Sequence, residues 1–208
     1  SVTVINGSDN STVTVPAGTM PFSIAVNPVT NRIYVANGGS NSVTVINGAD
    51  NSTETVTTPP VPVALAVNPV TNKIYVANSD NSSVTIIDGS SLAKVTIPTG
   101  TEPRSVAVNP LTNRIYVGNA SSSNVTVIDG SDYTTSTVTV GSGPNDIAVN
   151  LITNKIYVAN FTTNDVTVIN GSDNSATTLA AGARPYAIGV DPVTNKVYCA
   201  NNLSNNVT

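Results

Sequence analysis

The feature that most constrains this chain is a repeat with a period of 41 residues. One segment recurs five times, as NPVTNRIYVAN from Asn27, NPVTNKIYVAN from Asn68, NPLTNRIYVGN from Asn109, NLITNKIYVAN from Asn150 and DPVTNKVYCAN from Asp191. A second segment keeps the same step, from SVTVING at Ser1 to DVTVING at Asp165, and begins again as NVT at Asn206. The register contains no insertion or deletion. We therefore expect every unit to fold in the same way.

Each unit contains four short runs of β-forming residues separated by turn formers. In the first complete unit we expect strand A at Phe22–Val26, strand B at Arg32–Ala36, strand C at Val43–Ile46 and strand D at Thr53–Thr57. The Asn-Pro-Val-Thr-Asn segment between strands A and B, and the Asn-Gly step after strand C, are typical of tight turns. A proline precedes strand A in every unit, where the chain crosses between sheets. No segment has a sustained helical period, so essentially no helix is predicted.

Four short antiparallel strands repeated about every 40 residues are typical of a propeller blade. We predict an all-β, five-bladed β-propeller that forms a single domain over residues 1–208. The strands Val2–Ile5 and Thr12–Val15 are predicted to complete the blade that Tyr186–Val190 and Lys196–Ala200 begin. A closed monomer is favoured because it leaves no half-built sheet. Pairing between molecules, which gives a larger ring or a polymer, and a fragment of a longer propeller are the alternatives.

Two residue types mark the expected core. Five tyrosines hold one place in strand B: Tyr34, Tyr75, Tyr116, Tyr157 and Tyr198. We expect their rings to pack between blades, with each hydroxyl reaching a polar group. The single cysteine, Cys199, stands where the other units have valine. It is interpreted as a small buried hydrophobic residue rather than a reactive thiol.

The repeated I/V-Y-V-A-N segment, preceded by P-x-x-[IVL]-A-V-N-P, resembles the YVTN family of β-propeller repeats. These repeats are found in surface-layer and other cell-surface proteins. The resemblance covers all five units, although Ala or Gly replaces the Thr of the family name. It implies an extracellular or cell-surface location and a fold that serves mainly as a framework. Family members often have seven blades, so this chain departs from that pattern in its number of repeats.

Differences between the units collect near the D–A and B–C connections, which emerge on one face of a propeller. Residues on this face should surround one mouth of the central channel. Their aromatic, charged and amide side chains are predicted to bind a small polar ligand or a sugar. The predicted ligand-binding residues are Phe22, Glu102, Arg104, Asn145, Asp146, Phe161, Arg184 and Tyr186. The alternative is simple drift at exposed loop positions, with Glu102 and Arg104 forming only a surface ion pair.

The composition argues against several functions. The chain has no histidine, which removes the usual general base and a common metal ligand, and no cofactor is predicted. The net charge is −4 with scattered basic residues, which argues against nucleic-acid binding. No apolar run is long enough to span a membrane. One basic residue per unit begins strand B, and we interpret this set as serving solubility and edge protection: Arg32, Lys73, Arg114, Lys155 and Lys196.

Ten N-x-[ST] sequons occur in the chain. A chain rich in Asn, Ser and Thr also produces such triplets by chance, but several of these fall in expected turns, where glycans attach. The predicted acceptors are Asn10, Asn51, Asn81, Asn119, Asn160 and Asn202.

These observations favour a non-enzymatic, extracellular propeller that binds an unidentified protein or carbohydrate through one face. A lyase or hydrolase is an alternative, and it would need Asp80, Glu102 and Asp146 to converge on a cation. A structural subunit that polymerises by exchanging half-blades is another. The unbroken repeat also fits an engineered or recently amplified array without a ligand.

Overall fold

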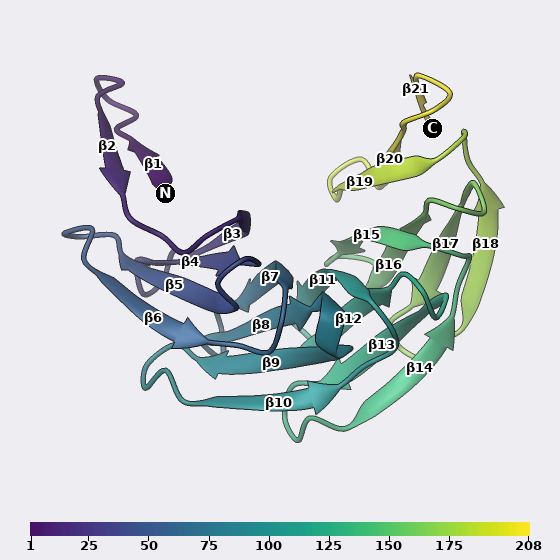
Figure 1. Ribbon diagram of the computed structural model, residues 1–208. Helices are drawn as coiled ribbons and strands as arrows, with labels where there is room; N and C mark the ends of the chain where they lie inside the picture. Colours follow the sequence, from purple (N-terminus) through teal and green to yellow (C-terminus); the bar gives the residue numbers. More distant parts are fainter.

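The computed structural model describes residues 1–208, and it is an open arc of six antiparallel sheets (Figure 1). The chain forms 21 strands, and the single helical segment is the 3₁₀ turn η1, Ser79–Asn81. The prediction of an all-β protein built from repeated four-stranded sheets is confirmed. The structure contains no helix that could span a membrane.

The sheets follow one another along the chain, and each pairs neighbouring strands. The N-terminal sheet is a hairpin of β1 (Val2–Ile5) and β2 (Thr12–Val15). Blade 1 contains β3 (Pro21–Asn27), β4 (Arg32–Asn37), β5 (Ser42–Asn47) and β6 (Thr53–Thr57). Blade 2 contains β7 (Pro62–Asn68), β8 (Lys73–Asn78), β9 (Ser83–Asp88) and β10 (Lys94–Pro98).

The later blades repeat this order. Blade 3 contains β11 (Pro103–Asn109), β12 (Arg114–Asn119), β13 (Asn124–Asp129) and β14 (Thr135–Thr139). Blade 4 contains β15 (Pro144–Asn150), β16 (Lys155–Asn160), β17 (Asp165–Asn170) and β18 (Ala176–Ala180). Blade 5 has three strands, β19 (Pro185–Asp191), β20 (Lys196–Asn201) and β21 (Asn206–Val207).

The first strand of each blade begins one residue earlier than predicted, at the recurring proline. In blade 1, Pro21 lies opposite Asn37, and the register shifts before Ser23 pairs with Ala36. Proline tolerates this place because the first residue of a strand at a bulge need not donate to the ladder. The bulge turns the chain between the D–A connection and strand A in every complete blade.

The turn between the first two strands of each blade is held by its leading asparagine. In blade 1 the Oδ1 atom of Asn27 accepts a hydrogen bond from the Val29 amide at 3.0 Å, and Asn31 adopts a left-handed φ of 52°. The Nδ2 atom of Asn27 donates to Oδ1 of Asn72 in blade 2 at 2.8 Å. Equivalent bonds, which we call the asparagine ladder, join the later blades: Asn68–Asn113 at 2.9 Å, Asn109–Asn154 at 2.8 Å and Asn150–Asn195 at 3.0 Å.

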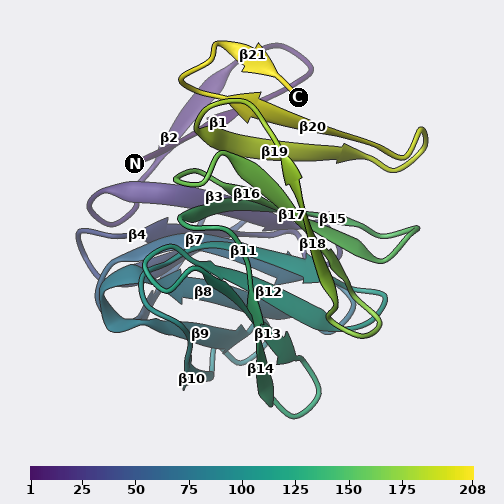
Figure 2. The same cartoon turned by 90° about the vertical axis from the view of Figure 1, so that its right-hand side faces the viewer.

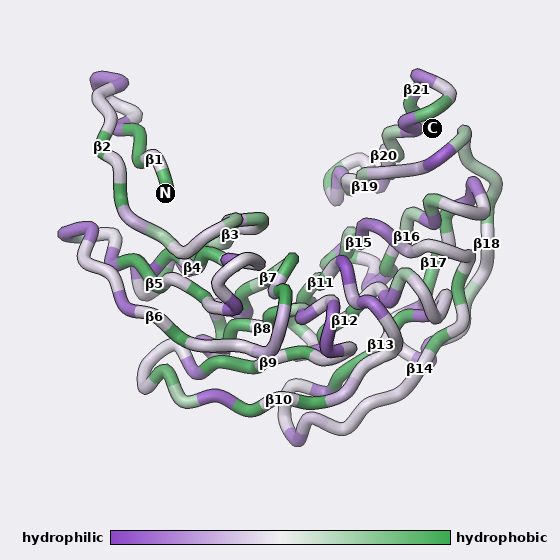
Figure 3. The backbone as a smooth tube through the Cα atoms, in the orientation of Figure 1, coloured by the Kyte–Doolittle hydropathy of each residue, from purple (hydrophilic) through white to green (hydrophobic).

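The hydrophobic core lies between the blades rather than inside each one. Tyr34 and Val45 of blade 1 pack with Ile74 and Ile87 of blade 2, and later junctions repeat this arrangement. Figure 3 shows the alternation of hydrophobic strands and hydrophilic turns that produces these junctions. The tyrosine rings at the first three junctions are fully buried as predicted: Tyr34, Tyr75 and Tyr116. The hydroxyls of these three tyrosines have no hydrogen-bond partner, so the predicted polar contacts are not formed.

The ring is not closed, and the predicted blade shared by the two termini does not form. Strand β1 pairs only with β2, and the outer edge of β20 pairs with β21. The N-terminal hairpin packs on blade 1 through Val2 and Val15. Figure 1 shows β1–β2 and β19–β21 as two separate ends of the arc, and in Figure 2 the C-terminal end lies in front of the N-terminal end. Strand β21 follows β20 after a short turn, so its pairing closes a much smaller loop than pairing with β1 would.

Candidate functional site

The D–A connections share an unusual backbone feature. The residue before the recurring proline has a positive φ in all five blades: Met20 (50°), Val61 (54°), Glu102 (57°), Gly143 (70°) and Arg184 (54°). One hydrogen bond recurs with this conformation. The carbonyl oxygen of the residue before the proline accepts a hydrogen bond from the amide of the residue that follows the second strand of the blade. For example, Ala120 donates to Glu102, and Asn202 to Arg184, both at 2.9 Å.

This conformation strains every blade except the fourth. Glycine adopts a left-handed φ without penalty, whereas a residue with a Cβ atom is disfavoured there by about 1–2 kcal/mol. Val61 is β-branched and is therefore the most strained of the five. Left-handed residues also occur in the A–B and C–D turns, where most are asparagine. The side chains that differ between blades, rather than the backbone, therefore mark the D–A face as the candidate site.

An acidic and a basic residue neutralise each other on this face in blade 3. The Arg104 Nε atom donates to Oε1 of Glu102 at 2.9 Å, and the Arg104 Nη2 atom and the Ser121 hydroxyl also donate to this carboxylate. The Ser121 hydroxyl and the Arg104 guanidinium lower the pKa of Glu102. This group is a satisfied ion pair at the surface.

A second cluster joins blades 4 and 5. The Arg184 guanidinium lies 5.2 Å from the centre of the Phe161 ring. The rings of Phe161 and Tyr186 meet edge to face, with 6.2 Å between centres and 73° between planes. Asn145 Nδ2 donates to the Tyr186 carbonyl at 2.7 Å. Arg184 has no ion-pair partner, so an exposed cation stands beside two aromatic rings. We call Phe161, Arg184 and Tyr186 the aromatic–arginine cluster.

The other two predicted residues lie apart from this cluster. Asp146 is occupied within the protein, because its two carboxylate oxygens accept the amides of Ile147 at 2.9 Å and Ile188 at 2.8 Å. Burial raises its pKa, and its bond to Ile188 ties blade 4 to blade 5. Phe22 lies in blade 1 with its ring against Gly38, where an added Cβ atom would come within 2.4 Å of it. The structure therefore divides the predicted site into separate groups.

Two residues that shape this face, Ser121 and Asn164, were not among the predicted site residues. Asn164 Oδ1 accepts the Arg184 amide at 2.8 Å, just as Asn41 Oδ1 accepts the Val61 amide at 3.0 Å. These asparagines precede the third strand of their blades and are 123 residues, or three repeats, apart. Their recurrence was visible in the sequence, but their bonding across to the next blade was not.

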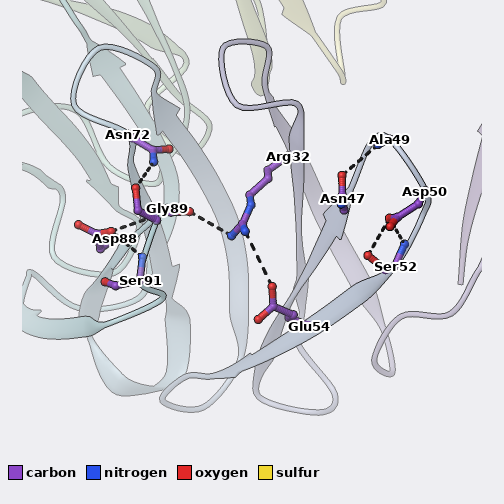
Figure 4. Close-up of polar contacts among 11 residues, drawn as sticks. Arg32, Asn47, Ala49, Asp50, Ser52, Glu54, Asn72, Asp88, Gly89 and Ser91 are labelled. Carbon is purple, nitrogen blue, oxygen red and sulfur yellow. Dashed lines mark hydrogen bonds and ion pairs between the residues drawn. The ribbon is translucent and has the colours of Figure 1, made fainter.

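The opposite face carries structural contacts (Figure 4). Arg32 Nη1 donates to the Gly89 carbonyl of the next blade at 3.1 Å and lies 3.9 Å from a Glu54 oxygen. Lys73 Nζ donates to Asp88 Oδ2 at 2.8 Å, and Lys73 lowers the pKa of Asp88. These two members of the predicted basic set thus hold neighbouring strands and turns together.

No group of three or more acidic or cysteine side chains lies close enough together to hold a metal ion. Asp80, Glu102 and Asp146 therefore do not converge as the carboxylate-based enzyme alternative requires.

The predicted glycan acceptors divide by exposure. Asn10, Asn81 and Asn202 are exposed, and Asn51 is partly exposed. The prediction is wrong for Asn119 and Asn160, which are 0% exposed. Their Nδ2 atoms, to which a glycan would be attached, instead donate to Thr126 Oγ1 and Thr167 Oγ1 at 2.9 Å each.

No family model matches the sequence, and no curated protein matches it. Solved structures do share the fold. Hydrazine synthase from Kuenenia stuttgartiensis is similar over 94% of this chain with a TM-score of 0.76 and 18% identity. A functionally unknown protein from Desulfotomaculum acetoxidans matches 99% of the chain and 74% of its own, with a TM-score of 0.79 and 14% identity. A nidogen/laminin complex matches 92% of the chain and 79% of its own, with a TM-score of 0.70 and 13% identity.

The chain spans 59% of the hydrazine synthase chain that it matches. At these identities the likeness concerns the fold alone. It shows that the sheets are arranged as in β-propeller-type proteins.

Proposed function

We propose that this chain is a non-enzymatic binding module of an extracellular or cell-surface protein, with YVTN-type repeats as its framework and the D–A face as its binding surface. The propeller-type fold and the repeat sequence support the framework. The differences between blades at the D–A face support its use in binding.

The aromatic–arginine cluster carries this proposal. Its guanidinium is free of acidic partners, whereas Arg104 on the same face is neutralised by Glu102. Tyr186 is 56% exposed, so its ring is available to a ligand. A guanidinium favours a carboxylate, and an aromatic face favours the apolar side of a sugar ring. The ligand class that best fits both is a saccharide that carries carboxylates.

Titration calorimetry with an oligomer of hexuronic acid and with a neutral glucose oligomer of equal length tests this proposal. We expect the acidic oligomer to bind and the neutral one to bind at least tenfold more weakly, because a charge-assisted bond contributes about 1.5–3 kcal/mol. Arg184→Gln should remove this preference. Arg104→Gln is the matched control and should leave it unchanged. Equal binding of both oligomers, or equal losses in both variants, would contradict the proposal.

The proposed location leads to a second test. Asn10, Asn81 and Asn202 are exposed sequon asparagines, so secretion from a glycosylating host should modify them. Peptide mass spectrometry should find glycans at these sites and none at Asn119 or Asn160. Modification of the two buried asparagines would contradict the described fold.

A further inference from the structure

The connection between strands β14 and β15 joins two inner blades, blades 3 and 4 (Figure 1). It carries two neighbouring backbone amides, those of Ser142 and Gly143, that donate no hydrogen bond within the protein. The carbonyl oxygens of these residues accept the amides of Thr162 at 3.0 Å and Phe161 at 2.9 Å, and Gly143 has a left-handed φ of 70°. Successive N–H groups in a turn of this kind form a concave anion-binding site called a nest. The pair is therefore a candidate site for a negatively charged group.

The equivalent amides in blade 5 show what such a pair binds. The Ala183 amide donates to Ser204 Oγ at 3.0 Å, and the Arg184 amide donates to Asn164 Oδ1 at 2.8 Å. A side-chain oxygen thus lies in front of each amide. In blade 4, Thr163 stands at the place of Ser204, but it does not accept the equivalent amide. Since no side chain supplies these two oxygens in blade 4, a ligand can supply them.

The free Gly143 amide is explained by one short side chain. Ser123 stands one repeat before Asn164, and both are left-handed, with φ of 52° and 60°. The carbonyl oxygen of each accepts the first amide after strand D, at 3.2 Å and 3.1 Å. The backbone is therefore placed alike at the two residues. The Ser123 hydroxyl, however, donates to Ser142 Oγ at 3.2 Å and does not accept the Gly143 amide.

Blade 3 has only half of this arrangement. Its Thr101 amide donates to Ser122 Oγ at 2.9 Å, so the Glu102 amide is the one free member of the pair. The Glu102 side chain is itself a carboxylate, which would repel a second anion. Gly143 has no side chain, and Thr162 Oγ1 lies 2.5 Å from the place that a Cβ atom would take. Blade 4 therefore combines two free amides with a nearby hydroxyl and with space that a side chain would fill.

The carboxylates of blade 4 near this connection are directed at donors of the protein. Both oxygens of Asp146 accept backbone amides. Asp165 lies beside Gly141, and its Oδ1 atom accepts a hydrogen bond from Asn160 Nδ2 at 2.6 Å. These donors stabilise the two charges where they are, so neither carboxylate occupies the pair of free amides.

We propose that the amides of Ser142 and Gly143 bind a carboxylate group of a ligand, and we call this pair the carboxylate nest. A carboxylate fits because it has two acceptor oxygens and no donor. Bonds from backbone N–H groups to a charged oxygen are shorter and stronger than bonds between neutral groups. In the nest, the ligand oxygens take the places that Ser204 and Asn164 oxygens hold in blade 5.

The carboxylate nest adjoins the aromatic–arginine cluster. The Phe161 amide donates to the Gly143 carbonyl at 2.9 Å, and the Phe161 ring lies 5.2 Å from the Arg184 guanidinium. An oligomer that carries a carboxylate on each sugar can therefore place one on Arg184 and another in the nest. This assignment of the second carboxylate to the same saccharide rests on the proposed function, whereas the nest itself does not.

Nuclear magnetic resonance of the isotope-labelled chain, titrated with sodium acetate, tests the nest directly. Acetate should move the amide proton resonances of Ser142 and Gly143 downfield, because both amides gain a charged acceptor. Sodium chloride at equal ionic strength should not. The amides of Ala183 and Arg184, which already have acceptors, should stay in place. No shift at Ser142 and Gly143, or equal shifts at all four amides, would overturn the proposal.

Ser123→Asn gives the matched variant, because it introduces the asparagine that Asn164 supplies in the next blade. Its side-chain oxygen should accept the Gly143 amide and abolish the acetate shift there. Asparagine tolerates the left-handed φ of this position, so the fold should be retained. Ser82→Asn, one repeat earlier, is the control and should leave the acetate shifts of the nest unchanged. A Gly143 shift that survives Ser123→Asn would overturn the proposal.

Calorimetry with the hexuronic acid oligomer separates the nest from the proposed function. Ser123→Asn should weaken oligomer binding about tenfold, as expected for the loss of one hydrogen bond to a charged group, and Ser82→Asn should not. In Arg184→Gln the acetate shifts of the nest should persist. If the oligomer does not bind but acetate still shifts both amides, the proposed function fails and the nest stands. If the oligomer binds but acetate shifts neither amide, the nest is overturned and the proposed function stands.

Discussion

The two faces of the arc are built from the same repeats but differ in how they are held. On the A–B and C–D face, the asparagine ladder repeats one hydrogen bond from blade to blade. On the D–A face, the same backbone fold recurs, but the side chains differ and four of the five left-handed residues are not glycine. The first face is uniform, and eight of its ten left-handed residues are asparagine, which tolerates this conformation, whereas the residues of the second face vary. Both faces hold neighbouring blades together, but the bonds of the first face use the same residue type throughout, whereas those of the second use different side chains, as at Ser23 and Asp146.

The largest loss of stability is expected on the uniform face. Asn68 is fully buried, donates to Asn113, and accepts the amides of Val70 and Thr71. Asn68→Ala should lower the free energy of unfolding by about 2–4 kcal/mol, because several buried groups lose their partners. Asp191→Ala, at the same place in blade 5 but without a neighbouring blade, should cost less. Chemical denaturation measures the free energy of unfolding of both variants. Equal losses would show that the bond between blades is not the cause of the effect at Asn68.

On the D–A face, the next effect is expected at Gly143, the one glycine among the left-handed residues. Gly143 has a φ of 70°, and an added Cβ atom would come within 2.5 Å of Thr162 Oγ1. Gly143→Val should therefore lower the free energy of unfolding by about 1–3 kcal/mol. Thermal and chemical denaturation check this, and a neutral result would show that the D–A connection tolerates a β-branched residue without strain.

The converse substitution should stabilise the protein. Val61→Gly relieves the left-handed strain at a φ of 54°, but it adds backbone freedom to the unfolded chain. We expect a net gain of about 0.5–1 kcal/mol in the free energy of unfolding. Val63→Gly, at a half-buried residue within strand β7, should destabilise the protein instead, because glycine weakens a strand interior. If both substitutions destabilise, the valine at this position is not strained.

The smallest effect is expected in the pH dependence of stability, at the hydrogen bond between Asp146 of blade 4 and the Ile188 amide of blade 5. Burial raises the pKa of Asp146 above its ordinary value of 3.8, so the folded protein binds this proton more tightly than the unfolded chain does. Its contribution to stability is full below pH 3.8 and is lost as the pH rises through the raised pKa. Asp146→Ser keeps an acceptor, as Ser23 does for the Leu65 amide at 3.3 Å, and should remove this dependence. The difference between the stability curves of the two proteins over this pH range tests it.

Much of the fold could be predicted because its information is local and repeated. The strand positions follow from the 41-residue period, and the A–B turn follows from its asparagines and proline. The left-handed residue before the proline was harder to predict, because Val61 and Arg184 are poor candidates for that conformation and only Gly143 suggests it. Ring closure depends on strands at opposite ends of the chain, and sequence patterns say little about such distant pairings.

The candidate site was predictable only in part, for a related reason. Comparing the units locates the D–A face and its unusual side chains, including Arg184 and Tyr186. The comparison cannot show that Glu102 neutralises Arg104, or that the Asp146 carboxylate accepts two backbone amides. It also cannot separate exposed sequons from Asn119 and Asn160, whose side chains turn inward to bond a threonine. These distinctions depend on side-chain direction within the assembled blades.

The asparagine ladder gives the molecule a direction. In each inner A–B turn the first asparagine donates a hydrogen bond to the next blade, and the last asparagine accepts one from the preceding blade. Reversing a blade would therefore break both bonds. A whole unit inserted at any junction would bring both the donor and the acceptor asparagine that its neighbours need, whereas a partial unit would leave one of these groups without a partner. Genetic gain or loss of entire 41-residue segments should therefore be far better tolerated than small insertions, which would account for the unbroken spacing along the chain.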